Sequence, residues 1–140
     1  MEKFTFSLTK VLEYRKGQEK QAKRIYAAAQ KELNEAEKQL EDKKIEKDSL
    51  LNIQEATINR MQVQQWYLLE LNQKIQESIQ QIQKLTVQTD KALNRYIEAQ
   101  KERKVLEKLA DKHFAEYQLQ ANREEQKMLD EMAGRRIKIS

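Results

Sequence analysis

Residues 68–117 read LLELNQKIQESIQQIQKLTVQTDKALNRYIEAQKERKVLEKLADKHFAEY, and this stretch decides the fold. A repeat of three and then four residues runs through it. Its positions are Leu68, Leu71, Ile75, Ser78, Ile82, Leu85, Thr89, Ala92, Tyr96, Ala99, Arg103, Leu106, Ala110, His113 and Tyr117. Most of them are apolar. A repeat that averages 3.5 residues keeps one face of a helix turned toward a partner helix. The stretch therefore predicts one helix of a coiled coil.

A second repeat of the same kind precedes it in the chain. Its positions are Leu8, Leu12, Arg15, Glu19, Ala22, Tyr26, Ala29, Leu33, Ala36, Leu40, Lys43, Lys47 and Leu50. From Ala22 to Leu40 every position of the repeat carries Ala, Leu or Tyr. We expect a change of phase at Lys43 and Lys47, because a charged side chain is poorly suited to an apolar seam.

Residues that build turns are scarce. The chain has no proline, and its two glycines, Gly17 and Gly134, lie near its ends. Gly, Pro, Asn and Asp dominate turns, so the segment 52–59, with Asn52, Thr57 and Asn59, is the best turn candidate. We predict helices over about 8–54 and 58–133 with a turn over about 55–57.

The expected helix ends carry residues suited to capping. Ser7 and Thr57 are predicted N-caps, since a hydroxyl oxygen accepts a free N–H of the first helical turn. Gly134 is predicted to end the second helix, because a left-handed residue at that point is usually glycine. Gly17 lies inside the first helix and is either simply tolerated or allows a partner backbone to approach closely.

These features predict an all-α fold, an antiparallel two-helix coiled coil that forms a single domain over 1–140. One continuous helix in a multi-chain coiled coil is the alternative. In the hairpin, Leu33 is expected opposite Ile79 and Leu12 opposite Gln100. The second helix then extends several turns past the first. An apolar stripe follows this extension, consisting of Phe114, Tyr117, Ala121, Met128 and Met132. Such a stripe indicates a binding surface for another protein or for a second copy.

Composition excludes several classes of function. The net charge is +4, cysteine is absent and the chain has one histidine. We expect no enzyme, cofactor or metal site, because His113 and Glu116 alone cannot build a carboxylate–histidine centre and no Gly-rich phosphate loop exists. Residues 1–7 lack the apolar run of a signal peptide, and no run is long enough to span a membrane. The expectation is a cytoplasmic protein, with nucleic-acid binding a distant alternative.

Four segments resemble the FliJ family, the stalk subunit of the flagellar type III export ATPase. They are FTFSLTKVLEYR at 4–15, AEKQL at 36–40, QQWYL at 64–68 and EEQKMLDEMA at 124–133. The resemblance implies an antiparallel two-helix coiled coil whose terminal end enters the ATPase hexamer and promotes its assembly and activity. It also implies contacts with the export gate in the inner membrane and with export chaperones, and a peripheral location at the flagellar base. An equivalent stalk of a virulence secretion ATPase and a generic homodimeric scaffold remain alternatives.

The resemblance also implies site residues. The ATPase-facing candidates are Phe4, Phe6, Val11, Leu12, Arg15, Gln126, Met128, Leu129, Met132 and Arg135, to which the apolar stripe adds Phe114 and Tyr117. The gate-facing candidates are Gln39, Tyr67 and Leu71, and two further positions of that family face carry Lys43 and Lys74.

Each of three other features allows two interpretations. Trp66 and Tyr67 either cap the hairpin or expose an anchor for a partner. The basic tail of Arg135, Arg136 and Lys138 either complements the dipole of the helix end or contacts an acidic surface. The Gln-rich stretch 73–88 is either a solvated face or a surface kept free for contacts.

Overall fold

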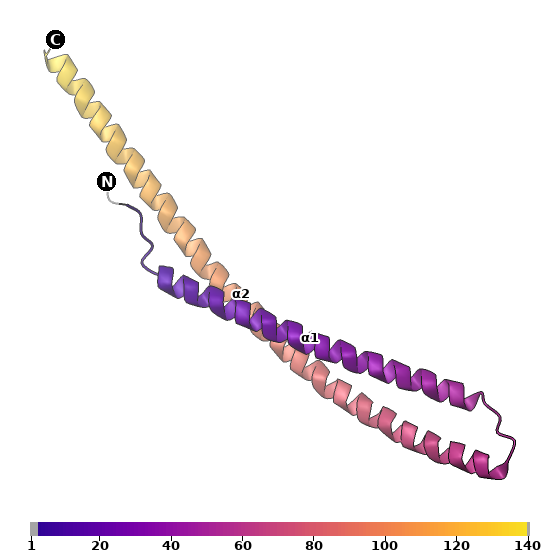
Figure 1. Cartoon of the computed structure of the whole chain (residues 1–140). Helices are drawn as coiled ribbons and strands as arrows, with labels where there is room; N and C mark the ends of the chain where they lie inside the picture. The colour runs from indigo at the N-terminus through magenta and orange to yellow at the C-terminus, as the bar shows by residue number, and fades with distance from the viewer. Residues whose placement is uncertain (1–2, 140) are drawn as a thin grey trace. The chain divides into compact units, whose positions relative to one another are not determined.

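Two helices make up nearly all of the described chain, α1 over Thr9–Leu51 and α2 over Ile58–Ile139 (Figure 1). The computed structural model describes residues 3–139, with side chains described as far as Arg135. The side chains of Arg136 and Lys138, part of the predicted basic tail, therefore lie outside the described residues. The two helices pack against each other in opposite directions, which confirms the predicted all-α antiparallel hairpin and excludes one continuous helix.

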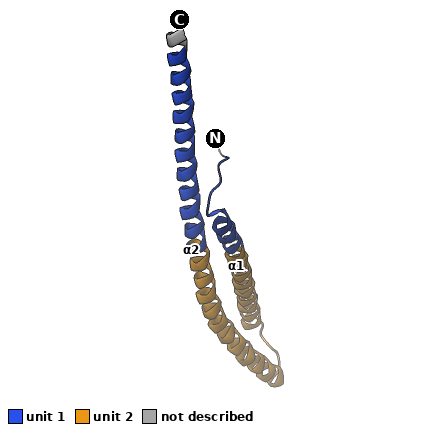
Figure 2. Ribbon diagram, turned by 90° about the vertical axis from the view of Figure 1, so that its left-hand side faces the viewer, with its two compact units in different colours: residues 1–20, 98–140 blue, residues 21–97 orange. Residues whose placement is uncertain are grey.

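The chain divides into two compact units, coloured in Figure 2. Unit 1 combines Met1–Lys20 with Glu98–Ser140, and unit 2 is Gln21–Ile97. Each unit contains a part of α1 and a part of α2. This division does not test the prediction of a single coiled-coil domain, which stays a prediction.

The seam of α1 follows the predicted repeat. Every position of the repeat from Leu12 to Leu50 is half-buried, including Lys43 and Lys47, while Ile45 and Leu51 are exposed. The predicted change of phase at Lys43 is therefore wrong. Its amine donates a hydrogen bond to the Ser78 hydroxyl at 2.8 Å, because a long aliphatic stem packs in the seam while its charged end reaches a polar partner.

The seam of α2 also follows its predicted repeat. All of its positions from Leu68 to Tyr117 are buried or half-buried. The buried residues of the described chain lie on this helix within unit 2 and are Leu71, Ile75, Leu85, Thr89 and Ala92. A two-helix hairpin offers each helix a single neighbour, so its core is only one seam wide.

The connection between the helices spans residues 52–57. Thr57 is the N-cap of α2, as predicted, since its hydroxyl oxygen accepts the Arg60 N–H at 3.3 Å and its carbonyl oxygen accepts the Met61 N–H at 3.0 Å. At the other end of the connection, the Gln64 amide donates to the carbonyl oxygens of Leu50 and Ile53, at 2.6 and 3.1 Å. A side chain of α2 thus satisfies carbonyl groups at the end of α1.

Three predicted helix ends are wrong. Leu8, not Ser7, occupies the N-cap position of α1, because its carbonyl oxygen accepts the Leu12 N–H at 2.9 Å. The first helix ends at Leu51, since the connection begins at residue 52 rather than 55. The second helix continues through Gly134 to Ile139, and Gly134 has no positive φ. Glycine permits a left-handed terminus but does not impose one.

The predicted register is displaced by about two helical turns. Tyr26 lies beside Tyr96, with ring centroids 6.4 Å apart, and the Thr89 hydroxyl donates to the Ala29 carbonyl oxygen at 3.4 Å. In this part of the hairpin, each of these residues of α1 thus meets a position of α2 later than the one expected. Close to the connection the contacts lie near the expected register, since Glu46 accepts from Tyr67 and the Leu50 carbonyl oxygen accepts from Gln64.

Candidate functional site: protein-binding surfaces of unit 1 and unit 2

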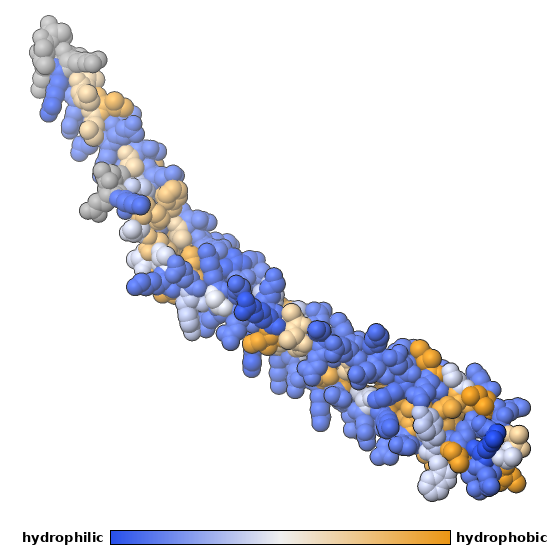
Figure 3. Space-filling model, in the orientation of Figure 1, coloured by the Kyte–Doolittle hydropathy of each residue, from blue (hydrophilic) through white to orange (hydrophobic). Residues whose placement is uncertain are grey.

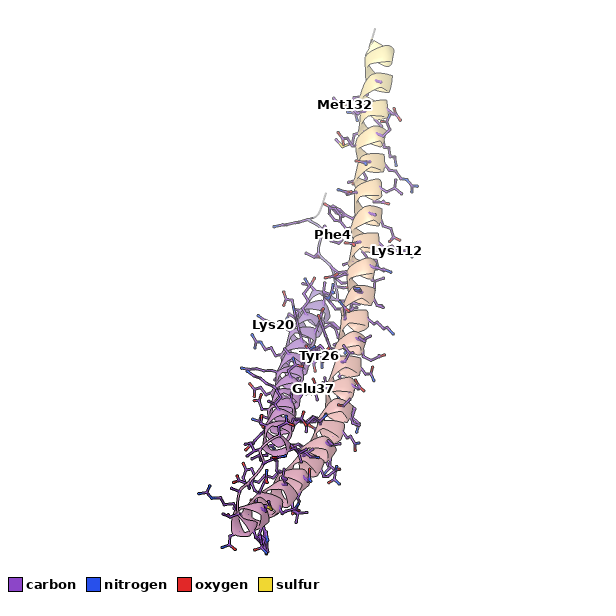
Figure 4. The ribbon with its side chains drawn as sticks, turned by 90° about the vertical axis from the view of Figure 1, so that its right-hand side faces the viewer. Phe4, Lys20, Tyr26, Glu37, Lys112 and Met132 are labelled. Carbon is purple, nitrogen blue, oxygen red and sulfur yellow. The ribbon has the colours of Figure 1, made fainter. Side chains whose placement is uncertain are left out.

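An aromatic cluster closes the N-terminal part of unit 1. Residues 3–8 are not helical, and Phe4 points toward α2 (Figure 4). The ring of Phe4 lies 5.1 Å from that of Phe114, edge to face, and 5.3 Å from that of Tyr117. The ring of Phe6 lies 5.4 Å from that of His113. Aromatic pairs at such distances contribute about 0.5–1.5 kcal/mol each beyond their buried area.

This cluster corrects the prediction that Phe114 and Tyr117 have no partner within the chain. The N-terminal segment follows the direction of α1 and extends its coverage of α2 to Tyr117. Phe114 keeps 44% of its surface exposed, so the segment covers this ring only in part. His113, the only histidine, is half-buried in the same cluster. Among the described residues, no three His, Cys, Asp or Glu side chains lie close enough to hold a metal ion.

Ion pairs fix the helices beside this cluster. Arg15 contacts Glu102 at 2.7 Å. Arg103 donates to Glu19 across the seam, with Nη2 3.2 Å from Oε1, and to Glu107 on its own helix at 2.7 Å. The hydrogen bond to Glu19 raises the pKa of Arg103 above its usual value. Two charged seam positions therefore compensate each other, an arrangement that specifies register more than stability.

The remaining apolar stripe of α2 is open to solvent. Every described side chain from Asn122 to Ala133 is exposed. Met128, Leu129 and Met132 have exposed fractions of 64%, 54% and 56%. At about 100° per residue, Met128 and Met132 share the face of α2 that carries Tyr117 and the aromatic cluster. This stripe matches the predicted surface, although it begins later along α2 than expected.

The other predicted ATPase-facing residues differ in their surroundings. Val11 and Arg135 are exposed, whereas Leu12 is half-buried in the seam. Gln126 donates to Asp130 one turn away at 3.1 Å, on a face of α2 away from the stripe. The structure thus brings Phe4 and Phe6 together with the stripe of α2, but not Gln126.

The predicted gate-facing residues all lie in unit 2, and they differ in exposure. Gln39 is exposed on α1. Tyr67 is 43% exposed, and its hydroxyl donates a hydrogen bond to Glu46. That hydrogen bond raises the pKa of Tyr67 above its usual value. Leu71 is 5% exposed and packs in the seam. The prediction of Leu71 as a gate contact is corrected, because a partner reaches it only if the helices part.

An apolar surface around the connection was only partly predicted. Apolar side chains gather at this end of the molecule in Figure 3. Eight of the exposed large apolar residues belong to it: Leu51, Ile53, Ile58, Met61, Val63, Trp66, Tyr67 and Leu69. Trp66 is 76% exposed, so it is an exposed side chain rather than a cap of the hairpin. The Gln-rich stretch that follows is largely exposed, which both of its interpretations require.

The comparison with protein families is specific. The profile of the family described as Flagellar FliJ protein matches residues 4–138. No curated protein and no solved structure match the chain. In the described residues, no helix is both long and apolar enough to span a membrane.

Proposed function

The chain belongs to the flagellar FliJ family, and from this premise we propose that it is a non-enzymatic stalk of the flagellar export ATPase. Family membership makes it a component of flagellar protein export. In the proposal, the terminal surface of unit 1 enters the hexameric ATPase and promotes its assembly and activity at the cytoplasmic base of the flagellum. The flagellar family favours this role over the same role in a virulence system.

One observation carries the proposal. The ring cluster of Phe4, Phe114 and Tyr117 and the exposed Met128 and Met132 lie on one face of α2 within unit 1. Exposed apolar stripes of this length mark interaction sites. Methionine suits a surface that adapts to its partner, because its unbranched thioether side chain repacks easily.

The exposed Gln39 and the accessible part of Tyr67 in unit 2 remain the proposed contacts for the cytoplasmic part of the export gate. Export chaperones are further proposed partners. Leu71 is left out of the gate surface because it is buried.

The experiment combines the purified chain with its cognate export ATPase. We expect the chain to co-elute with the ATPase, to increase the fraction of hexamer and to raise the rate of ATP hydrolysis. The chain alone is expected to hydrolyse no ATP. Failure to co-elute, together with an unchanged rate, would refute the proposed role.

A further inference from the structure

The first turns of α2 are apolar on two opposite faces. Leu68, Leu71 and Ile75 point into the seam. At about 100° per residue, Trp66 and Leu69 point away from it. Trp66 is 76% exposed and Leu69 67%. This second face takes no part in the seam. It is also separate from the proposed surface of unit 1, since all of these residues belong to unit 2.

This outer face is almost free of charge. Charged residues make up 36% of the chain, yet Arg60 is the only one among residues 58–69. The neutral residues of the outer face are Ile58, Asn59, Gln62, Val63, Trp66, Leu69 and Gln73. Glu70 lies on this face one turn after Trp66 and is paired with Lys74 at 3.5 Å. Depletion of charge together with an exposed Trp is typical of the centre of a protein interface.

We propose that this face binds the same face of a second copy of the chain, with Trp66 next to the two-fold axis. In a two-fold interface, a residue close to the axis meets its own counterpart. A charged residue on the axis would face a like charge, and Trp66 is neutral. Because the two-fold axis lies across the helices, side chains on the same side of Trp66 meet, which places Gln62 near Leu69 and Val63 near Glu70 of the second copy.

The available area fits such a contact. At their exposed fractions of 75%, 69%, 76% and 67%, Ile58, Val63, Trp66 and Leu69 offer roughly 500–600 Å² of apolar surface. A standard interface buries about 800 Å² per partner, and about 65% of a homodimer interface is apolar. The apolar part of that area is about 520 Å², which these four side chains supply.

The charges farther along α2 select the relative direction of the two copies. Lys84 and Lys91 lie on the same outer face, where they line a shallow groove with Val87. Parallel helices would set each lysine against its own counterpart. An antiparallel crossing at Trp66 avoids this repulsion, because each copy of α2 then leaves the contact in the opposite direction.

Anionic lipid is a poorer occupant of this face. Membrane-surface helices are rich in Lys and Arg on their polar side. Here the charged residues around the face are Glu55, Arg60, Glu70 and Lys74, which sum to no net charge.

The test measures mass and fluorescence as the chain is diluted from about 100 μM, where a dimer with a micromolar dissociation constant is populated. We expect the sedimentation mass to rise from 16.7 kDa toward twice that value as concentration increases. Trp66 is the only tryptophan, so its emission is expected to shift to shorter wavelength over the same range. Trp66→Ser should weaken dimerisation at least about tenfold, with the helix content by circular dichroism unchanged.

Val87→Ser is the matched control, because Val87 is 53% exposed on the same face of the same helix. It should leave dimerisation unchanged. The absence of cysteine allows a second test: Gln62→Cys chains mixed with Leu69→Cys chains should form an intermolecular disulfide faster than either variant alone. A monomer at every concentration would overturn the proposal. So would a dimer that Trp66→Ser leaves intact, or a mixed-disulfide rate no higher than that of the single variants. Saturable binding to phosphatidylglycerol vesicles by a chain that stays monomeric would overturn it in favour of a lipid surface.

Discussion

At the scale of single residues, polar side chains of one helix are held by specific partners on the other. Tyr67 shows this outside the core, where its hydroxyl donates to the Glu46 carboxylate across the hairpin of unit 2. This hydrogen bond is the main reason that the pKa of Tyr67 is raised, and desolvation and the negative charges of Glu46 and Glu70 add to it.

The raised pKa gives a testable pH dependence. A group whose folded pKa lies above its unfolded value contributes stability that is present below the unfolded pKa, here about 10, and lost as the pH rises through the folded value. NMR titration of ¹³C-labelled tyrosine should give Tyr67 a midpoint above 10. In Glu46→Ala the midpoint should fall, because the main cause of the raised pKa is removed.

Glu70→Ala is the control for this titration, since Glu70 is the smallest contributor to the raised pKa. It should lower the midpoint of Tyr67 much less than Glu46→Ala does. Equal midpoints in the wild type and in Glu46→Ala would show that the hydrogen bond to Glu46 is not the cause.

Residue types alone identified the seam but not the way its polar members are accommodated. Lys43 suggested a break in the repeat, yet the repeat continues because its amine reaches Ser78. Arg103 and Glu19 occupy the seam as a pair. A single sequence does not show which residue of the other helix will face a charged seam position, since that depends on the register.

At the scale of the elements, Gly17 is a weak point of α1. A Cβ atom built on Gly17 meets no atom within 4 Å, and its φ is not positive. Gly17→Ala should therefore stabilise the chain by about 0.5–1 kcal/mol, because alanine loses less backbone entropy in a helix. Urea unfolding followed by circular dichroism measures the change. Gly134→Ala, equally unobstructed but close to the end of α2, should have a smaller effect, and a loss of stability in Gly17→Ala would contradict this description of the helix.

The two faces of α2 can be compared with a pair of neighbouring leucines. Leu71 is 5% exposed and Leu69 is 67% exposed. Leu71→Ala should cost about 2 kcal/mol or more of unfolding free energy, the lower part of the range for buried leucine. Leu69→Ala should change it by no more than about 0.5 kcal/mol. Both are measured by urea unfolding at low micromolar concentration, and equal effects would contradict the assignment of the seam.

The elements were largely predictable, whereas their ends and register were not. The repeat of α2 gave its inward face, and the Thr57 hydroxyl marked its start. The end of α1 was misplaced because no Gly or Pro marks it. The register is displaced where Tyr26 lies beside Tyr96, and a regular repeat fits this alignment and the expected one equally well.

At the scale of the whole molecule, each compact unit carries an apolar surface that its own packing leaves open. In unit 1 this surface is centred on Met128 and Met132, and in unit 2 on Trp66. The sequence predicted the first surface but placed its start too early, because nothing in the pattern shows that a non-helical Phe4 packs on Phe114 and Tyr117. The second surface was indicated only by the adjacent Trp66 and Tyr67.

The central claim is that the open stripe of unit 1 binds the flagellar export ATPase. Its most direct test is the ATP hydrolysis rate of the cognate ATPase, titrated with the wild-type chain and with a Met128→Ser, Met132→Ser double variant. The control is Val105→Ser, since Val105 is 65% exposed in the same unit but lies outside the stripe. We predict that the wild type and the control stimulate hydrolysis equally, and that the double variant needs at least about tenfold more protein for the same effect. Equal stimulation by the double variant and the wild type would contradict the account.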